Sequence, residues 1–340
     1  MQTETPKKYE IDRSSFIEFS GRKLYRIRAL VKLPGVNVGG YGGFIEKEHN
    51  LSHEGNSWVF GDAKVYNSAR VYDNARVYGK SHCCGGSRIH GDATINDNAL
   101  VQCYAEVFGH SKVNAYATVS GQALIFGKAS LYGNAYVGGS ALVGDGIVGD
   151  RTTVIDQARV LCPVRLSGYT TLCNDATILT PRDCVTVDSI GSRNAPITFY
   201  RTRDNGVSVI TGCFNDTLNA FVKAVRERHG GTQHEKEYNL LVEIVRLRML
   251  HQKPYHGSLQ ISTKELLTLV RRQNGAIVTA RWVDTDSVYT FQHVDSDSYR
   301  VAIGGCPMTA VDTTTFTANH RGTWSVDCSQ FDAGEGGKNV

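Results

Sequence analysis

Apolar residues return at every sixth position through the middle of the chain. From Val59 to Val143 this position holds an aliphatic side chain, with Cys83 as the one departure, and a small residue, Ala or Ser, follows four places later. After Val143 the spacing is five once, and it is six again from Val148 to Ile178. A short fixed period is typical of repeat architectures, so it decides the fold class before any local element is assigned.

Six residues suit one short strand and a corner. The aliphatic residue is expected to point inward from the strand, and the small residue to point inward near the corner. Gly, Asp and Asn fall between them, as at Gly61-Asp62 and Asp73-Asn74, and these residues tolerate the left-handed backbone of a sharp corner. Three hexads close a triangular coil, so residues 18 apart stack and residues 59–192 form a parallel β-helix of about seven coils.

Motifs at both ends of the repeat resemble a known family. They are Tyr25–Leu30, Gly39–Glu46, Asn50–Ser52 and Gly55–Val59 at the entry, and Ile190–Asn194, Thr198–Thr202 and Gly212–Phe214 at the exit. Over roughly residues 20–250 the chain is similar to the YdcK-like members of the hexapeptide-repeat superfamily, found in phages and prophages and labelled "polymer-forming". The resemblance implies a left-handed parallel β-helix and brings no catalytic signature.

The sequence outside the repeat divides into further units. Residues 1–58 are expected to form a tail, disordered over 1–15, then a hairpin over 16–30 around Ser20-Gly21 and a cap on the first coil. Residues 193–254 predict two strands, a helix over 217–229 capped by Asp216, and a helix over 235–252. Residues 255–332 predict a small α+β domain whose helix starts at a capping box of Ser262 and Glu265, and residues 333–340 a disordered tail.

The second of these helices is expected to bury one apolar face. The predicted buried residues are Tyr238, Leu241, Ile244, Val245 and 247–250. The fold class is therefore mainly β, a parallel β-helix with small C-terminal α+β domains.

Charge is unevenly distributed along the chain. Residues 59–192 carry 11 basic and 11 acidic residues, whereas residues 193–254 carry 10 basic and 6 acidic ones. This basic segment supplies the predicted partner-binding residues Arg226, Arg228, Arg246 and Arg248. Acidic residues alternate with them, which is typical of a solvated surface, so the segment favours a protein partner over nucleic acid.

Composition also indicates the environment of the protein. The start of the chain is polar, with no signal peptide, and no apolar run is long enough to cross a membrane. Nine cysteines without paired spacing indicate a reducing compartment, here the cytoplasm of a bacterial host. Cysteine and histidine spacing does not suggest a metal site, and no cofactor is expected.

Acyltransferases occur in the hexapeptide-repeat superfamily and need a histidine base, so catalysis has to be weighed. The candidate bases are His90 and His110. The repeat has no inserted loop between Val59 and Val143 to hold an acyl-CoA donor, so this activity is the alternative rather than the preferred interpretation.

Residues just after the inward aliphatic positions form a stacked aromatic column. It consists of Tyr72, His90, Phe108 and Phe126, each 18 residues from the next. Such a column stiffens a β-solenoid, and it also predicts an apolar interface with a second copy of the chain. The preferred function is therefore a non-catalytic phage or prophage scaffold that self-associates and binds a host protein, with blocking of a host defence complex as one version.

Overall fold

The computed structural model describes residues 7–250, 258–272, 276–283, 287–295, 298–303, 309–312, 316–317, 320 and 322–327. The chain is mainly β, with a parallel β-solenoid of about 8 turns and a small C-terminal antiparallel domain, which confirms the predicted fold class. It divides into two compact units, one of residues up to 143 with 147–154, the other of residues 144–146 and 155 onward.

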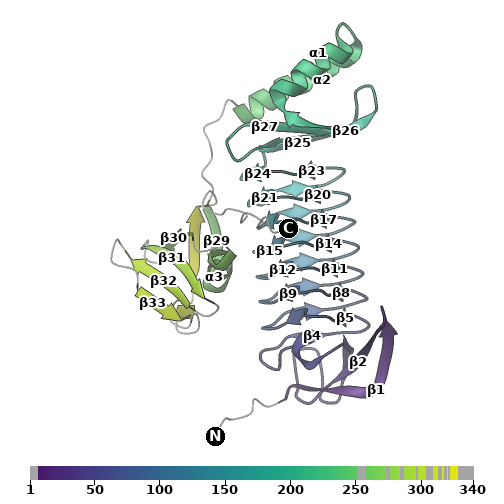
Figure 1. The fold of residues 1–340 in the computed structure, drawn as a ribbon, viewed down its shortest axis with the longest axis vertical. Helices are drawn as coiled ribbons and strands as arrows, with labels where there is room; N and C mark the ends of the chain where they lie inside the picture. The colour runs from purple at the N-terminus through teal and green to yellow at the C-terminus, as the bar shows by residue number, and fades with distance from the viewer. Residues whose placement is uncertain are drawn as a thin grey trace, which may run out of the picture. The chain divides into compact units, whose positions relative to one another are not determined.

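The first unit consists of short strands stacked in three parallel sheets (Figure 1). One sheet contains β3 (Tyr41–Ile45), β5 (Lys64–Val65), β8 (His82–Cys83), β11 (Leu100–Val101), β14 (Thr118–Val119), β17 (Tyr136–Val137) and β20 (Thr153–Val154). The second contains β4 (Trp58–Val59), β7 (Arg76–Val77), β10 (Thr94–Ile95), β13 (Lys112–Val113), β16 (Ser130–Leu131) and β19 (Ile147–Val148). The third contains β6 (Arg70–Val71), β9 (Arg88–Ile89), β12 (Glu106–Val107), β15 (Leu124–Ile125) and β18 (Leu142–Val143).

The hexad pattern gives both the register and the core of this solenoid. Residues 18 apart pair in parallel, as where Val113 lies opposite Ile95 on one side and Leu131 on the other. The inward series from Val59 to Val143 has no exposed surface, and the small residues from Ala63 to Ala141 have none or almost none. Cys83 belongs to this interior, and burial raises the pKa of its thiol.

The corners use left-handed backbone, as predicted. Gly61, Asp73 and Asp97 have φ angles of 59°, 58° and 59°. Aspartates at corners also hold the next turn: Asp73 Oδ2 accepts from the Gly91 amide at 3.2 Å and Asp97 Oδ2 from the Ala115 amide at 3.0 Å. A carboxylate at a corner therefore caps a backbone amide one turn further along.

The N-terminal segment is more ordered than predicted. Strands β1 (Tyr9–Phe19) and β2 (Arg22–Ala29) form the expected hairpin around Ser20-Gly21, but β1 begins at Tyr9, inside the range expected to be disordered. β2 pairs with β3, and β3 pairs in parallel with β5. Parallel pairing therefore starts at Phe44, one turn before Lys64, and a short helix, η1 (Glu48–Asn50), lies within this first turn.

Two side chains of the hairpin bind the backbone of the first turn. Lys8 Nζ donates to Ser57 O at 2.9 Å and to Glu54 O at 3.2 Å, and burial lowers the pKa of Lys8 to about 8. The Tyr9 hydroxyl lies 2.8 Å from both Glu48 O and Leu51 O, so its one proton serves one of these carbonyls at a time.

The second unit begins with the last strands of the hexad pattern, β21 (Arg159–Val160), β22 (Arg165–Leu166), β23 (Thr171–Leu172) and β24 (Thr177–Ile178). An antiparallel sheet follows, with strands β25 (Cys184–Ile190), β26 (Ala195–Arg201), β27 (Val207–Thr211) and β28 (Phe214–Thr217) in sequential order. The sequence predicts β26 and β27, whereas β25 falls within the range assigned to the β-helix. Helices α1 (Leu218–His229) and α2 (Gln233–Val245) and a π-helical segment, η2 (Arg246–Leu250), complete what we call the α/β module, residues 184–250.

Two details of the helices differ from the prediction. The N-cap of α1 is Thr217 rather than Asp216, because the Thr217 hydroxyl accepts from the Ala220 amide at 3.2 Å. Ile244, Leu247 and Leu250 were expected to be buried but are 47%, 67% and 48% exposed, because the side of α2 and η2 that packs in the module is formed by Tyr238, Leu241, Val242, Val245 and Met249. The remainder of the predicted helix, residues 251 and 252, lies outside the described residues.

The C-terminal domain contains β29 (Ser258–Ser262), α3 (Thr263–Arg272), β30 (Val278–Trp282), β31 (Val288–Asp295), β32 (Ser298–Ile303), β33 (Thr309–Asp312) and β34 (Thr323–Asp327). The predicted capping box is present, since the Ser262 amide donates to Glu265 Oε2 at 2.8 Å and the Glu265 amide to Ser262 Oγ at 3.4 Å. The tail 333–340 lies outside the described residues.

Candidate functional site

A hollow in the α/β module lies where two turns of its sheet meet the end of α1. Its volume is about 580 Å³, a size typical of ligand pockets. The β25–β26 turn contributes Ser192 and Arg193, the β27–β28 turn contributes Gly212 and Cys213, and the last turn of α1 contributes Arg228 and its neighbours. Irregular backbone from two turns and a helix end is thus gathered at one place, as in many recognition sites.

A glycine and a tyrosine shape one wall of this hollow. Gly191 has a φ of 69°, and a Cβ there would lie 1.8 Å from the Tyr238 hydroxyl oxygen. The turn needs glycine for both its left-handed backbone and the space that the Tyr238 side chain occupies. Helix α2 is held in place at its start by Thr232, whose hydroxyl accepts from the Glu235 amide at 3.4 Å, and this cap precedes Tyr238 by six positions.

The floor of the hollow is aromatic. Phe221 of α1 makes edge contacts with Phe199, Phe214 and Tyr238, with ring centroids 5.9, 5.4 and 5.4 Å apart. Phe199 and Phe221 belong to the core of the module, and Phe214, Phe221 and Tyr238 line the hollow. Such rings fix the shape of the floor and offer an apolar surface to a bound side chain.

The rim of the hollow is basic. Arg193 and Arg228 are exposed, and neither forms an ion pair with any residue that the structure describes. Arg193 Nη1 lies 3.9 Å from Cys213 Sγ, which links the two sheet turns. Glu227 also lines the hollow, and its carboxylate lies 3.9 Å from Lys223 Nζ. Two arginines beside an apolar floor can bind a carboxylate that is attached to an apolar group.

The structure separates the four arginines that the sequence grouped. Arg228 lines the hollow, but Arg226, on the same helix, does not. Arg246 and Arg248 belong to η2, and Arg248 Nη2 donates to Pro181 O at 3.2 Å. Sequence reasoning missed Arg193 and Cys213 as members of the site, because they lie 20 positions apart in two different turns. The signal available for them was the pair of turn glycines, Gly191 and Gly212.

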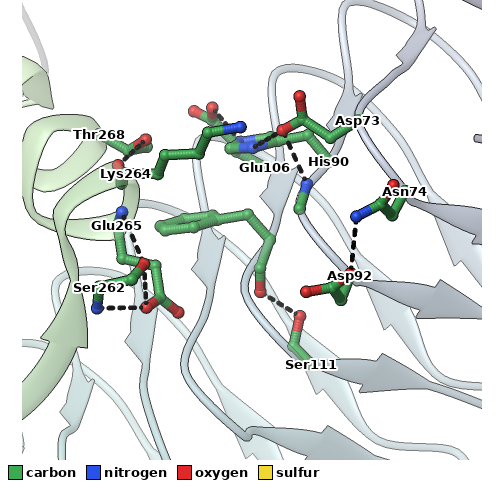
Figure 2. A network of polar contacts seen from close by, with 12 residues as sticks. Asp73, Asn74, His90, Asp92, Glu106, Ser111, Ser262, Lys264, Glu265 and Thr268 are labelled. Carbon is green, nitrogen blue, oxygen red and sulfur yellow. Dashed lines mark hydrogen bonds and ion pairs between the residues drawn. The ribbon is translucent and has the colours of Figure 1, made fainter. Parts of the chain in front are cut away.

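The two candidate bases of the solenoid lie in different surroundings. Figure 2 shows the first of them, His90, beside Asp73 and Glu106. His90 Nε2 lies 3.0 Å from Glu106 Oε1 and Nδ1 lies 3.9 Å from Asp73 Oδ2, while both ring faces are covered by Tyr72 and Phe108. His110 is exposed, with Nδ1 3.5 Å from Asp92 Oδ2. Asp92 in turn accepts from Asn74 at 3.1 Å, as part of a polar ladder along the solenoid.

The aromatic column is present as a continuous stack. Ring centroids are 4.7 Å apart for Tyr72 and His90, 5.0 Å for His90 and Phe108, and 5.6 Å for Phe108 and Phe126, with nearly parallel planes. Self-association through these four residues stays a prediction.

Comparison with known proteins adds no assignment. No family model matches the sequence, and no curated protein matches it significantly. Within the described ranges no helix is both long and apolar enough to span a bilayer. The same residues include no group of three or more His, Cys, Asp or Glu side chains that could hold a metal ion.

Proposed function

We propose that the protein is a non-catalytic β-solenoid scaffold that binds another protein through the α/β module. The observation that carries this proposal is the hollow beside α1, with its aromatic floor and its two arginines that lack carboxylate partners among the described residues. Arginine and aromatic side chains supply much of the binding energy in protein interfaces.

The source and the partner follow from the resemblance rather than from the hollow. A YdcK-like phage or prophage protein would act in the cytoplasm of the bacterial host, on a host protein. One version of the proposal is that binding blocks a host defence complex by occupying its surface. The charge of the rim favours an acidic segment of that partner.

A pair of arginines on the same helix provides the test. Arg228→Glu places a negative charge at the hollow, whereas Arg226→Glu makes the same change on an exposed residue of α1 that does not line it. Wild-type protein and both variants, with folding checked by circular dichroism, are used to capture proteins from a lysate of host bacteria. The proposal predicts a partner that is retained by Arg226→Glu and lost by Arg228→Glu. Equal capture by all three forms, or equal loss in both variants, contradicts it.

The second candidate function is transfer of an acyl group from acyl-CoA. One observation favours it: Glu106 hydrogen-bonds His90, and a carboxylate that orients a histidine is common in general-base catalysis. The covered faces of the His90 ring count against it, and His110 is the exposed alternative. Calorimetry with acetyl-CoA distinguishes the two functions, since a scaffold should release no binding heat and an acyltransferase should.

A further inference from the structure

Helix α2 and the first part of η2 carry a second apolar face that no described part of the chain covers. Leu240, Ile244 and Leu247 are 62%, 47% and 67% exposed. Tyr238, Leu241, Val242, Val245 and Met249 form the buried side of the same segment. A helix that is apolar on two sides usually has contacts on both, since a solvated face is normally polar.

The spacing of the exposed residues is that of a helix–helix seam. Leu240 and Ile244 are four positions apart, and Ile244 and Leu247 three apart, which is the alternation of a coiled-coil heptad. Leu247 is the second residue of η2 and Leu250 is its last. Because each step through the wider π-helical turn moves a residue further from its α-helical position, Leu250 is displaced from the line of Leu240 and Ile244 more than Leu247 is. The seam therefore consists of three residues, and Leu250 lies off it.

The charged residues beside the seam are complementary to a second copy of the same helix. Glu243 and Arg248 flank the seam five positions apart, the separation at which parallel coiled-coil helices pair opposite charges. Glu243 is exposed and forms no ion pair with a described residue, and the exposed Arg248 makes one hydrogen bond, to Pro181 O at 3.2 Å. A two-fold axis parallel to the helices would place each Glu243 near the Arg248 of the other copy, so one surface supplies both halves of the interface.

We propose that the protein forms a homodimer through parallel pairing of α2, with Leu240, Ile244 and Leu247 at its centre. This surface is separate from the arginine-rimmed hollow, so the proposal does not depend on the proposed function. Three aliphatic residues from each copy bury far less than the ~1,600 Å² of a standard interface. We therefore expect a weak dimer, with a dissociation constant between about 1 μM and about 1 mM.

Sedimentation velocity over this concentration range tests the pairing. The full-length wild type should shift from monomer to dimer, and Leu247→Lys should weaken the dimer at least tenfold, since it places a charge in the seam. Leu250→Lys is the matched control, because Leu250 is also an exposed leucine at 48%, in the same segment but off the seam, and should dimerise as the wild type does. A wild type that stays monomeric at about 1 mM overturns the proposal, and so does an equal effect of the two substitutions.

Charge exchange tests the partner and the orientation. Glu243→Arg and Arg248→Glu should each weaken the dimer several-fold, because each leaves like charges facing one another in both flanks. An equimolar mixture of the two variants should recover pairing. In the mixed dimer the two substituted side chains, which carry opposite charges, face one another on one side of the seam, and the native Glu243 and Arg248 face one another on the other side.

Recovery of pairing in the mixture supports a parallel pair of identical helices. Two variants that associate as the wild type does, or a mixture no stronger than either alone, overturn it.

Discussion

Strand β13 allows the inward and outward positions of the solenoid to be compared at neighbouring residues. Val113 has no exposed surface and lies between Ile95 and Leu131, whereas Lys112 of the same strand is exposed and lies between Thr94 and Ser130. Val113→Asp and Lys112→Asp introduce the same side chain into the same backbone. The two variants differ in whether the carboxylate enters the interior.

The expected difference between the two variants is large. Val113→Asp loses about 1.5–3 kcal/mol of apolar burial. It also places a carboxylate without a partner in the core, which costs several kcal/mol more. The total, about 5 kcal/mol or more, is comparable with the whole stability of an ordinary domain. Lys112→Asp should change the free energy of unfolding by less than about 0.5 kcal/mol, as exposed substitutions usually do.

Urea unfolding followed by far-ultraviolet circular dichroism measures this difference. Because each turn of a solenoid is stabilised by its neighbours, Val113→Asp should lower the transition midpoint for the turns around β13 or leave them unfolded without urea. Lys112→Asp should retain the midpoint of the wild type. If both variants lost the same free energy, the assignment of inward and outward positions would be wrong.

Three further outcomes can be checked by equilibrium unfolding. Gly191→Ala should cost about 1–3 kcal/mol, since it combines a left-handed φ with overlap on Tyr238, and a stability equal to wild type would argue against the described turn. Because the folded pKa of Lys8 is lowered from 10.5 to about 8, this group binds more protons in the unfolded chain between these values, so the contribution of Lys8 to the unfolding free energy should rise with pH across this window, measured as the difference between wild type and Lys8→Met. Lys8→Met should remove that rise, and a slope that persists unchanged would assign it to another group. Asp97→Ala should cost about 1–3 kcal/mol, because it leaves the Ala115 amide without its acceptor and places alanine at a left-handed φ, whereas Asp97→Asn, which keeps an acceptor oxygen and tolerates this φ, should cost less.

The repeat could be predicted well from sequence because each hexad carries its own signal. Inward Val, corner Asp and small Ala recur at fixed positions, so a local error would be corrected by the next turn. The first turn could not be recognised in this way, since β3 reaches its place through Gly42 and Gly43 rather than through a hexad. Its parallel pairing with β5 depends on contacts that the periodic pattern does not contain.

The α/β module was less predictable because its faces are decided by packing. The period of α2 is compatible with burial on either of two sides, and the sheet selects the side of Tyr238 and Val245 over that of Ile244 and Leu247. The hollow depends on two turns that come together when β25–β28 pair in antiparallel order. Distances between turns are set by the fold, so Arg193 and Cys213 could not be joined from sequence spacing.

The side chains of Lys8 and Tyr9 have a consequence for how the protein could polymerise. A β-solenoid can extend end to end when the carbonyl and amide groups of its first turn accept strands from another molecule. Here the Lys8 ammonium group donates to the carbonyl oxygens of Glu54 and Ser57. The Tyr9 hydroxyl lies beside the carbonyl oxygen of Leu51. The outer edge of β3, the first parallel strand of the solenoid, is paired with β2, and β2 is paired with β1. Strand β1 has a bulge between Asp12 and Phe16. Fibre growth through this end would first have to displace the hairpin, so any higher assembly of intact chains should form through other surfaces.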